Sequence, residues 1–555
     1  MISPQEALAV PLLAILPEGL RERIIRRAAD VTVAEGEWFV YEGDPPMFWI
    51  VISGEVELLR TVAGRLERAT TFDPGEFFGE VPLMLGSGAS RGCRAMRTSR
   101  LMRLDPTEFH AMVVNCPEAG AMLAQTLVRR VNLIREGFAA MTQTRATIVG
   151  GHYDFRCHDI RDFLSRNQVP FEWLDPSDPG DRQAIAPDLL EVEQHPLVVV
   201  DNKIRLVQPS LRELANALEL QTQPNAGTYD VAIVGGGPAG LAAAVYGGSE
   251  GLRTIMIERE APGGQAGTSS RIENYLGFPG GISGSDLANR GLNQAKRFNT
   301  EILVTRSVSE IRPSGAVFEI VLDGDQRITT RAIVIATGVA WRMLDGEGAE
   351  RLIGRGLYYG AARTEALETR GRDIFLIGGG NSAGQAAMFF ANYARSVTLL
   401  VRGPSLEKSM SHYLIEQLHS KENVVVETGV SLERAVGDEH LEAIVTRDRH
   451  GVETTRPADD LFAFIGADAQ TAWLPIGIER DAHGYIRTGG CLETWTLERA
   501  PYALETSIPG IFAAGDVRSE SVKRVASGVG EGSMVIAFVH QYFDTLARVE
   551  AGSAH

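Results

Sequence analysis

The sequence predicts an α/β protein of several domains, built around two doubly wound nucleotide-binding units, one nested within the other. Three observations lead to this fold class. Two glycine-rich turns, at 235–240 and 378–383, each follow a short apolar strand and open a helix. Strands and helices alternate from Asp230 onward. A chain of 555 residues is too long for one core, so about three or four domains of ~100–200 residues are expected.

Composition indicates an ordinary globular chain, with 44% hydrophobic and 23% charged residues. A net charge of −17 would repel a phosphate backbone, so no nucleic-acid partner is expected. No run approaches the ~20 apolar residues that cross a bilayer, and the run at 8–16 lacks the flanks of a signal peptide, so we expect a cytoplasmic protein without a membrane span. The four cysteines, Cys93, Cys116, Cys157 and Cys491, form no C-x-x-C, which argues against a disulfide framework and against a metal site.

The first glycine turn has the features of a dinucleotide-binding site. It follows the strand at 229–234 and consists of Gly235, Gly237, Pro238, Ala239 and Gly240. Its first glycine permits a tight turn, the second lets the backbone approach a pyrophosphate, and the third lets the helix pack on its strand. The helix N-terminus then faces the pyrophosphate with its partial positive charge. Glu258 ends the next strand, at 254–257, where a carboxylate can accept the ribose hydroxyls.

Residues 229–545 resemble low-molecular-weight thioredoxin reductases along essentially their whole length. The resemblance is carried by Gly263-Gly264-Gln265, Glu273-Asn274-Tyr275, Ala336-Thr337-Gly338, the GGGNSA turn at 378–383, the run at 506–516, and the run at 522–527, which opens the last helix. It implies that the first fingerprint holds FAD. It also implies flavin contacts from Gly264, Gln265, Asn274, Thr337, Gly338, Gly515, Asp516, Val525 and Ala526.

The second fingerprint is expected to hold a nicotinamide nucleotide. Its residues are Gly378, Gly380, Asn381, Ser382 and Ala383. In the resembled family, an H-R-R-x-x-x-R run after the next strand grips the 2′-phosphate of NADPH. Here only Arg402 remains, Glu407 would repel a phosphate, and Lys408 or Ser409 are candidates to compensate. We expect NADPH, with NADH as the alternative; a nicotinamide domain that no longer binds is a further alternative.

The cysteine pair of the resembled family is missing. Aligned through Gly356 and Gly378, Gly360 and Arg363 stand where the two redox cysteines belong, and Thr364 replaces the acid that follows them. Disulfide exchange needs a thiolate, which none of these side chains supplies. The sequence therefore predicts no direct thioredoxin-disulfide reductase activity, and names no catalytic acid or base.

Residues 145–222 show strands at 146–149, 171–174, 197–200 and 204–207, with helices over 160–166 and 211–218. They resemble a glutaredoxin-like thioredoxin fold, with His195-Pro196 where that family has its cis-proline. Its two active-site cysteine positions fall on Asp154 and Cys157, so no internal disulfide can form. A structural or docking role is expected, with a one-cysteine redox role as the alternative.

Residues 15–140 resemble the cyclic-nucleotide-binding fold, with helical apolar spacing from Thr107 to Gly137. Glycine-acid turns at 35–37, 42–44, 53–56 and 74–81 carry the resemblance. It implies that Gly79 and Glu80 meet the ribose of a cyclic nucleotide, and that an arginine meets its phosphate. The expected arginine position falls on Ala89 or Ser90; a short insertion at 86–88 would restore Arg91 to it. Two alternatives follow for this domain: it binds a cyclic nucleotide, or it is an interaction module that binds none.

These observations predict four domains. They are a cyclic-nucleotide-binding-like domain at 1–141, a thioredoxin-like domain at 145–222, an FAD domain at 228–343 and 466–545, and an NAD(P)H domain at 344–465. The leading interpretation is an FAD-dependent NAD(P)H oxidoreductase, which forms a homodimer as the resembled reductases do. Its electron acceptor would be a quinone, an iron–sulfur protein or a small molecule. The alternatives are a flavin-bearing sensor or scaffold with little turnover, and thioredoxin reduction through an external thiol.

Overall fold

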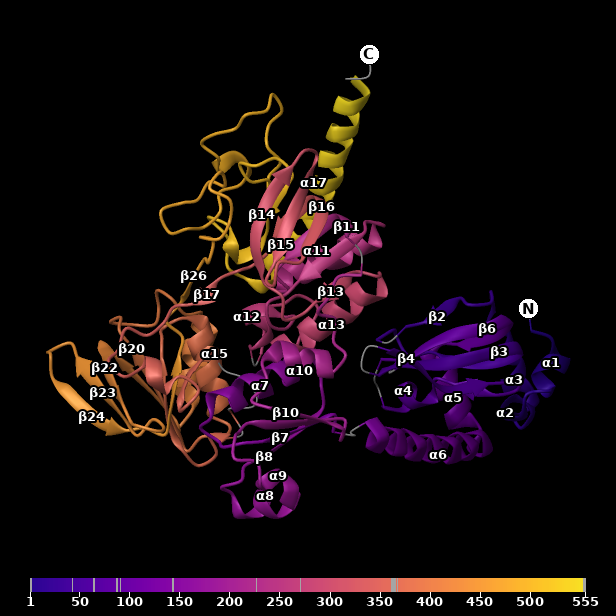
Figure 1. Cartoon of the computed structure of the whole chain (residues 1–555). Helices are drawn as coiled ribbons and strands as arrows, with labels where there is room; N and C mark the ends of the chain where they lie inside the picture. The colour runs from indigo at the N-terminus through magenta and orange to yellow at the C-terminus, as the bar shows by residue number, and fades with distance from the viewer. Residues whose placement is uncertain are drawn as a thin grey trace. The chain divides into compact units, whose positions relative to one another are not determined.

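The computed structural model describes residues 2–41, 43–62, 65–85, 88–89, 91–141, 144–225, 227–269, 271–360, 366 and 368–552 (Figure 1). The chain divides into two compact units, Met1–Gln143 and Thr144–His555. Among the described residues, no helix combines the length and the apolar character that a bilayer crossing requires. Each unit is built on sheets of its own.

The first unit is an antiparallel β-roll with helices at both ends of its sequence. Strand order is β1-β6-β3-β4, with β2 paired to β6 and β5 paired to β3. The strands are β1 (Ala29–Val33), β2 (Trp38–Val40), β3 (Phe48–Val62), β4 (Arg65–Phe72), β5 (Phe77–Phe78) and β6 (Gly92–Leu104). The helices are α1 (Pro4–Leu8), α2 (Pro11–Ala14), α3 (Glu18–Arg27), α4 (Glu80–Leu85), α5 (Pro106–Asn115) and α6 (Pro117–Met141).

The helical stretch expected from Thr107 to Gly137 is divided into α5 and α6. Cys116 separates them with an extended backbone, at φ −139° and ψ 97°. Pro117 accounts for this break, since its ring disfavours helical geometry in the residue before it. The roll closes over a core that includes Phe48, Ile50 and Phe109.

The second unit begins with residues 144–225, called here the middle segment. Its sheet has the order β10-β9-β7-β8, in which β7 and β8 are parallel and the other pairs antiparallel. The strands β7 (Ala146–Val149), β8 (Phe171–Leu174), β9 (Leu197–Val200) and β10 (Ile204–Val207) lie where the sequence predicts them. The helices are α7 (Phe155–Arg166), α8 (Pro179–Ala184), α9 (Pro187–Leu190) and α10 (Leu211–Ala217).

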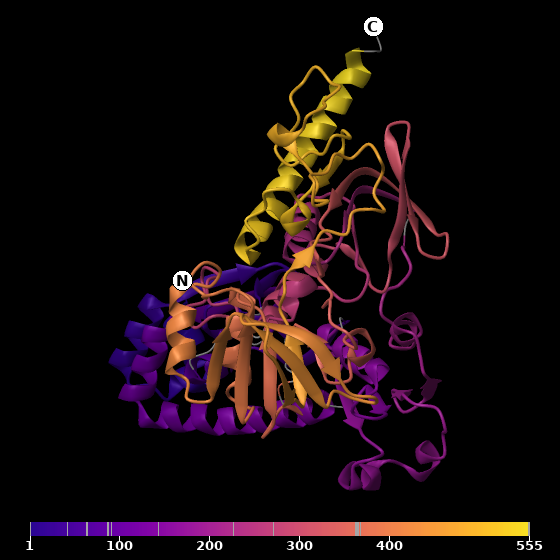
Figure 2. The ribbon, with the colours of Figure 1, turned by 90° about the vertical axis from the view of Figure 1, so that its left-hand side faces the viewer.

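The outer α/β part comprises residues 228–343 and 466–552. Its seven-stranded sheet has the order β13-β12-β11-β16-β15-β14, and β27 pairs with β16. The strands are β11 (Thr228–Val234), β12 (Thr254–Ile257), β13 (Glu301–Leu303), β14 (Val308–Ser314), β15 (Val317–Leu322), β16 (Arg327–Ile335) and β27 (Ile511–Ala513). The helices are α11 (Pro238–Ser249), α12 (Gly264–Gly267), α13 (Gly284–Arg297) and α17 (Val525–Gly552), the long yellow helix of Figure 2.

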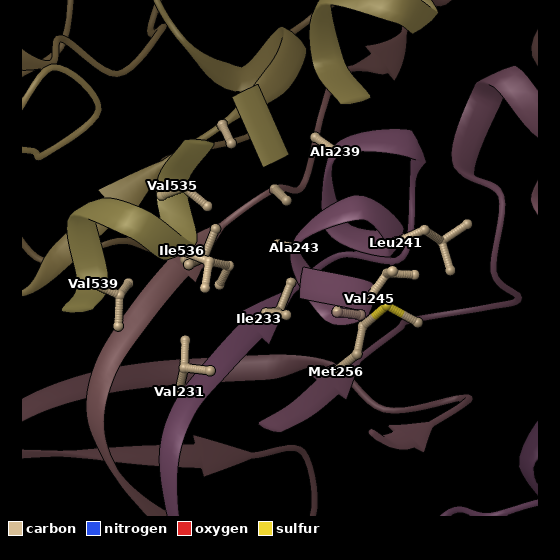
Figure 3. Packing of buried hydrophobic residues seen from close by; sticks show 14 of the residues in the cluster. Val231, Ile233, Ala239, Leu241, Ala243, Val245, Met256, Val535, Ile536 and Val539 are labelled. Carbon is tan, nitrogen blue, oxygen red and sulfur yellow. The ribbon is translucent and has the colours of Figure 1, made fainter. Parts of the chain in front are cut away.

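Helices α11 and α17 pack together in the core of the outer α/β part. Figure 3 shows Val535, Ile536 and Val539 of α17 in one apolar cluster with Val231 and Ile233 of β11. The helices approach closely because a glycine lies at their crossing: a Cβ on Gly532 would lie 2.1 Å from the Ala239 carbonyl oxygen. This contact brings the N-terminal turn of α17 to the N-terminal turn of α11.

The inner α/β part, residues 344–465, is inserted in the outer one. Its parallel sheet has the order β18-β25-β19-β20-β21, and β22, β23 and β24 form a separate antiparallel sheet. The strands are β18 (Leu357–Tyr359), β19 (Asp373–Ile377), β20 (Ser396–Val401), β21 (Val424–Thr428), β22 (Val430–Val436), β23 (Ala443–Asp448), β24 (Glu453–Pro457) and β25 (Asp460–Ala463). Its helices include α15 (Asn381–Phe390) and α16 (His412–Ser420). The connections into and out of it pair as β17 (Ala340–Trp341) and β26 (Ala467–Asp468).

Candidate active site

The first glycine turn has the geometry that a pyrophosphate requires. Gly235 has a φ of +106°, and a Cβ there would lie 2.4 Å from the Ala336 carbonyl oxygen. A Cβ on Gly240 would lie 1.9 Å from the Gly235 carbonyl oxygen, so only glycine lets α11 begin this close to β11. No described side chain caps the start of α11 at Gly237, so the first N–H groups of the helix are available to an anion. The neighbours Pro238 and Ala239 form the first turn.

Glu258 lies at the end of β12 beside this turn. Its side chain accepts the Gly236 N–H at 2.6 Å and the Glu260 N–H at 2.9 Å. Burial raises the pKa of Glu258, while these two N–H groups and the Arg166 cation act in the opposite direction. The arrangement holds a carboxylate beside the helix N-terminus, as ribose binding requires.

Of two further predicted flavin residues, Gly264 faces the glycine turn and Gln265 follows it in α12. The nearest atom to a Cβ on Gly237 would be the Cα of Gly264, 3.9 Å away, so the turn is open on this side. Gln265, in α12, donates from its amide to the Val339 carbonyl at 2.8 Å. This bond connects α12 to the loop that holds Thr337 and Gly338.

That loop contains a polar atom that its neighbours do not satisfy. The Thr337 hydroxyl oxygen is buried and has no hydrogen-bond partner among the described residues. Gly338 has a φ of +60°, and nothing lies within 4 Å of a Cβ placed on it. An orphaned buried hydroxyl next to open space fits a bound group such as a flavin.

The C-terminal flavin residues gather at the start of α17. Gly515 has a φ of +79°, and its N–H donates to a carboxylate oxygen of Glu531 at 2.6 Å. Asp516 is half-buried, which raises its pKa, and it accepts the Ser521 hydroxyl at 3.3 Å. Val525 and Ala526 form the first turn of α17, where Val525 is half-buried and Ala526 exposed.

Two residues that the sequence analysis did not single out hold this corner together. Arg518 donates to both carboxylate oxygens of Glu531, at 3.0 and 2.8 Å. Glu531 thereby fixes the Gly515 turn against α17, and a Cβ on Gly515 would lie 2.9 Å from that of Ala239. Asn274, by contrast, is exposed, so the structure does not bring it into the buried part of the site.

The second glycine turn repeats the geometry of the first. Gly378 has a φ of +145°, and its Cβ would lie 2.5 Å from the Phe464 carbonyl oxygen. Gly380 precedes α15, and no described side chain caps that helix start. Asn381 accepts the Ser411 N–H at 2.7 Å, and the Ser409 hydroxyl donates to the Gly379 carbonyl at 2.7 Å. Ser382 is exposed, Ala383 is buried, and Arg402 lies exposed just beyond β20.

Gly360, at the first expected cysteine position, lies close to Thr268 and Trp341 of the outer α/β part. Its φ is +93°, and a Cβ would lie 3.6 Å from the Thr268 hydroxyl and 3.7 Å from the Trp341 ring. A cavity of about 30 Å³ brings these groups together with Ser382 and Gln385 of the second fingerprint helix. Residues of the outer and of the inner α/β part therefore line one cavity at Gly360. Arg363 and Thr364 lie outside the described residues.

In the middle segment, the cis peptide expected at His195-Pro196 is present. Cys157 is fully buried, and burial raises the pKa of its thiol to about 12. A Cβ on Gly150 would lie 2.3 Å from the Cys157 sulfur. Asp154, at the other cysteine position, caps α7 by accepting the Arg156 N–H at 2.9 Å.

The first unit contains a cavity of about 630 Å³ that Gly79, Glu80 and Arg91 help to line. Gly79 has a φ of +92°, and its Cβ would lie 2.0 Å from the Met47 carbonyl oxygen. Glu80 is 1% exposed, and its second carboxylate oxygen has no hydrogen-bond partner in the described part of the chain. Arg130 of α6, which sequence reasoning missed, contacts the other oxygen at 2.6 Å. A cavity of this size accommodates a small organic ligand.

Comparisons with known proteins support the assignment of nucleotide-binding sites in both units. The family described as "Pyridine nucleotide-disulphide oxidoreductase" matches residues 229–532, and "Cyclic nucleotide-binding domain" matches residues 30–116. Thioredoxin reductase from Listeria monocytogenes is 35% identical over 321 residues, which are 57% of this chain and 95% of the relative. A 34.2 kDa protein in the rubredoxin operon of Clostridium pasteurianum is 32% identical over 314 residues, 56% of this chain and 96% of that protein.

Two solved structures similar to this chain are also thioredoxin reductases. The crystal structure of T. acidophilum thioredoxin reductase shares 27% identity with this chain at a TM-score of 0.52, over 58% of this chain and all of the other. Thioredoxin reductase of Lactococcus lactis in the FR conformation shares 28% identity with a TM-score of 0.51, over 57% of this chain and 98% of the other. The protein belongs to the pyridine nucleotide-disulphide oxidoreductase family, as a thioredoxin-reductase-like FAD- and NAD(P)H-dependent oxidoreductase with an N-terminal cyclic nucleotide-binding domain.

Proposed function

We propose that this protein oxidises NADPH through FAD and passes the electrons to an acceptor other than a disulfide. The observation that carries the proposal is Gly360, a residue without a side chain, which lies beside Thr268 and Trp341 where the resembled reductases have a redox cysteine. Residues 229–545 contain one cysteine, Cys491, so no disulfide can form within them. Bound FAD would supply hydride acceptance and two-electron transfer.

The chain's own residues would bind and orient the two nucleotides. The N-terminal turns of α11 and α15 supply uncapped N–H groups for the two pyrophosphates. Glu258 would hold a ribose of FAD, and Arg402 would favour the 2′-phosphate of NADPH. Gly360 leaves the site without sulfur, so a quinone, an iron–sulfur protein or a small organic molecule would take the electrons.

Three of the four thiols are buried, which supports this acceptor class. Cys157 is buried with its thiol pKa raised to about 12, so it is not a thiolate near pH 7. Cys93 and Cys116 are buried in the first unit, and Cys491 is exposed. We propose that the middle segment, with its glutaredoxin-like order of elements, serves structure or docking rather than thiol exchange. A homodimer is the proposed assembly, as in the resembled reductases.

Turnover with two kinds of acceptor tests the proposal. The full-length flavoprotein should oxidise NADPH with ferricyanide or menadione as acceptor. It should not reduce DTNB when NADPH and thioredoxin are supplied. NADPH-dependent DTNB reduction through thioredoxin would contradict the proposal, and would support reduction through an external thiol. Wild-type thioredoxin reductase serves as the positive control.

A second function, cyclic-nucleotide sensing, is supported by the cavity of the first unit. Glu80 offers a buried carboxylate oxygen with no partner among the described residues, as the ribose hydroxyl of a cyclic nucleotide requires. We propose that a cyclic nucleotide occupies this cavity and regulates the oxidoreductase. If NADPH reduces the flavin but no acceptor supports steady turnover, sensing becomes the main function.

A further inference from the structure

We propose that Arg166, which lies on α7 of the middle segment and outside the flavin-binding fold, is a positioning residue for the adenosine end of FAD. The inference rests on the proposed assignment of Glu258 as the ribose carboxylate. It gives the middle segment a part in cofactor binding, although that segment has no cysteine pair. A short bridge, residues 259–262, joins Glu258 to the Gly263-Gly264 turn and lies between Arg166 and the ribose site.

Arg166 fastens that bridge at two points. Its guanidinium donates to the Ala261 carbonyl at 2.8 Å and to a carboxylate oxygen of Glu260 at 3.2 Å. Only residues 259–262 separate Glu258 from the glycine turn. Fixing Glu260 and Ala261 therefore fixes the distance and direction between the ribose acid and the turn that faces Gly237. The Arg166 side chain is 13% exposed and Ala261 is buried, so solvent weakens the bond to the Ala261 carbonyl little. Glu260 is 45% exposed, so its ion pair with Arg166 is screened more strongly.

The charge of Arg166 also acts on Glu258. Burial of the Glu258 carboxyl raises its pKa, which favours the neutral form, and the Arg166 cation favours the ionised form. Glu260 lies on the same loop and opposes ionisation. An ionised carboxylate is the stronger acceptor for ribose hydroxyls. Removing the cation would therefore weaken the ribose contact even if the loop kept its shape.

Contacts that do not involve the bridge at 259–262 also hold helix α7 in place. Arg161, one turn earlier, stacks on the Trp173 ring at 4.0 Å and pairs with Glu368 of the inner α/β part. Asp162 accepts from Arg166 at 3.2 Å along the helix. Elsewhere, Arg212 donates to the Thr305 carbonyl at 2.5 Å and pairs with Asp323. Arg212 thus anchors the same segment to the same outer part through Thr305 and Asp323. Among the described residues, its hydrogen bonds and ion pairs do not reach the bridge at 259–262, so it provides a matched control.

Nucleotide affinity of the full-length chain, stripped of flavin and then titrated, tests the inference. FAD binding is followed by flavin fluorescence, and ADP binding by calorimetry. Arg166→Ala and Arg166→Gln should each weaken FAD binding by about 10-fold, since a charge-assisted contact is lost. ADP affinity should fall by the same factor, because the contact is in the adenosine half that both ligands share. Arg166→Lys, which keeps the charge, should restore part of the affinity, and Arg212→Ala should change neither Kd by more than about twofold.

The outcomes separate this inference from the site on which it rests. If Glu258→Gln weakens FAD binding while Arg166→Gln and Arg166→Ala bind like wild type, the positioning role is wrong and the site stands. If Glu258→Gln also binds like wild type, the assignment of the ribose site is wrong. Weaker FAD binding with unchanged ADP binding would also overturn the inference, since the lost contact would then lie outside the adenosine half that both ligands share.

Discussion

Arg130 and Glu80 form an ion pair across the cavity of the first unit, with Nη1 2.6 Å from Oε1. Arg130 comes from the last helix of the unit, and its guanidinium lies 5.1 Å from the Phe72 ring centroid and 5.2 Å from that of Phe77. The pair neutralises a carboxylate that is 1% exposed, and it leaves the other carboxylate oxygen available to a ligand. A ligand hydroxyl at Glu80 would therefore be bound next to the helix that leads out of the unit.

Glu80→Gln should weaken cyclic-nucleotide binding by about 10-fold or more, because a charge-assisted hydrogen bond to the ribose becomes a neutral one. The measurement is calorimetric titration of the full-length protein with cAMP and with cGMP. Glu76→Gln is the control, since Glu76 lines the same cavity but is exposed. Equal affinities for the two variants would show that Glu80 does not hold the ligand.

Gly532 and Gly530 lie two residues apart in α17 and should respond oppositely to alanine. A Cβ on Gly532 would lie 2.1 Å from the Ala239 carbonyl oxygen, whereas nothing lies within 4 Å of one on Gly530. Gly532→Ala should therefore separate α17 from α11, lower the Tm and reduce the FAD content. Gly530→Ala should raise stability by up to about 1 kcal/mol, the helix-propensity gain. A Gly532→Ala protein with wild-type Tm and flavin content would contradict the packing described here.

The Arg402 side chain should give the protein its preference for NADPH over NADH. It is exposed beyond β20, at the edge where the second fingerprint opens. Arg402→Ala should raise the KM for NADPH by about 10-fold and leave that for NADH unchanged, because only NADPH carries the 2′-phosphate. Lys408→Ala, also exposed, tests the compensating cation. If the Arg402 variant shifts both KM values equally, Arg402 does not read the phosphate.

His152 should make the protein less stable in acid. Burial and the nearby Arg372 and Arg161 cations lower its pKa from 6.5 to about 4. Between these values the unfolded chain binds a proton that the folded chain does not, so stability falls as pH drops from 6.5 to 4. The loss should be about 1–2 kcal/mol, because solvent reaches part of the ring and Glu368 lies 3.6 Å from its Nε2. His152→Gln should flatten the decline of Tm over this range. The control is the exposed His483, whose replacement by Gln should leave the decline unchanged.

Local patterns were sufficient to predict several of the strands and both glycine turns. Gly235, Gly240 and Gly378 could be recognised because the chemistry of a tight turn is encoded within a few neighbouring residues. The strands at 146–149 and 254–257 were predicted to the residue, since each is a short apolar run between polar breaks. The helical stretch after Thr107 was predicted as one element because the sequence periodicity continues through the break at Pro117.

The residues that complete the sites could not be found in the same way. Arg130 reaches Glu80 from 50 positions away, and Arg166 reaches Glu260 from 94. Glu531 meets the Gly515 turn only because the glycine at 532 lets α17 approach α11. An arginine or glutamate on a helix has no local signature for its distant partner, so such contacts appear only once the elements are packed.

The number of electrons that the enzyme takes up distinguishes a flavin that works alone from a flavin coupled to a redox disulfide. Full-length holoprotein is titrated anaerobically with dithionite and then, in a fresh sample, with NADPH, while the flavin absorbance is followed. A flavin beside Gly360 without a redox disulfide should be bleached completely by two electrons per FAD, and NADPH should reduce it. An uptake of four electrons per FAD would reveal a disulfide in exchange with the flavin. That result, or a flavin that stays oxidised with excess NADPH, would contradict the account.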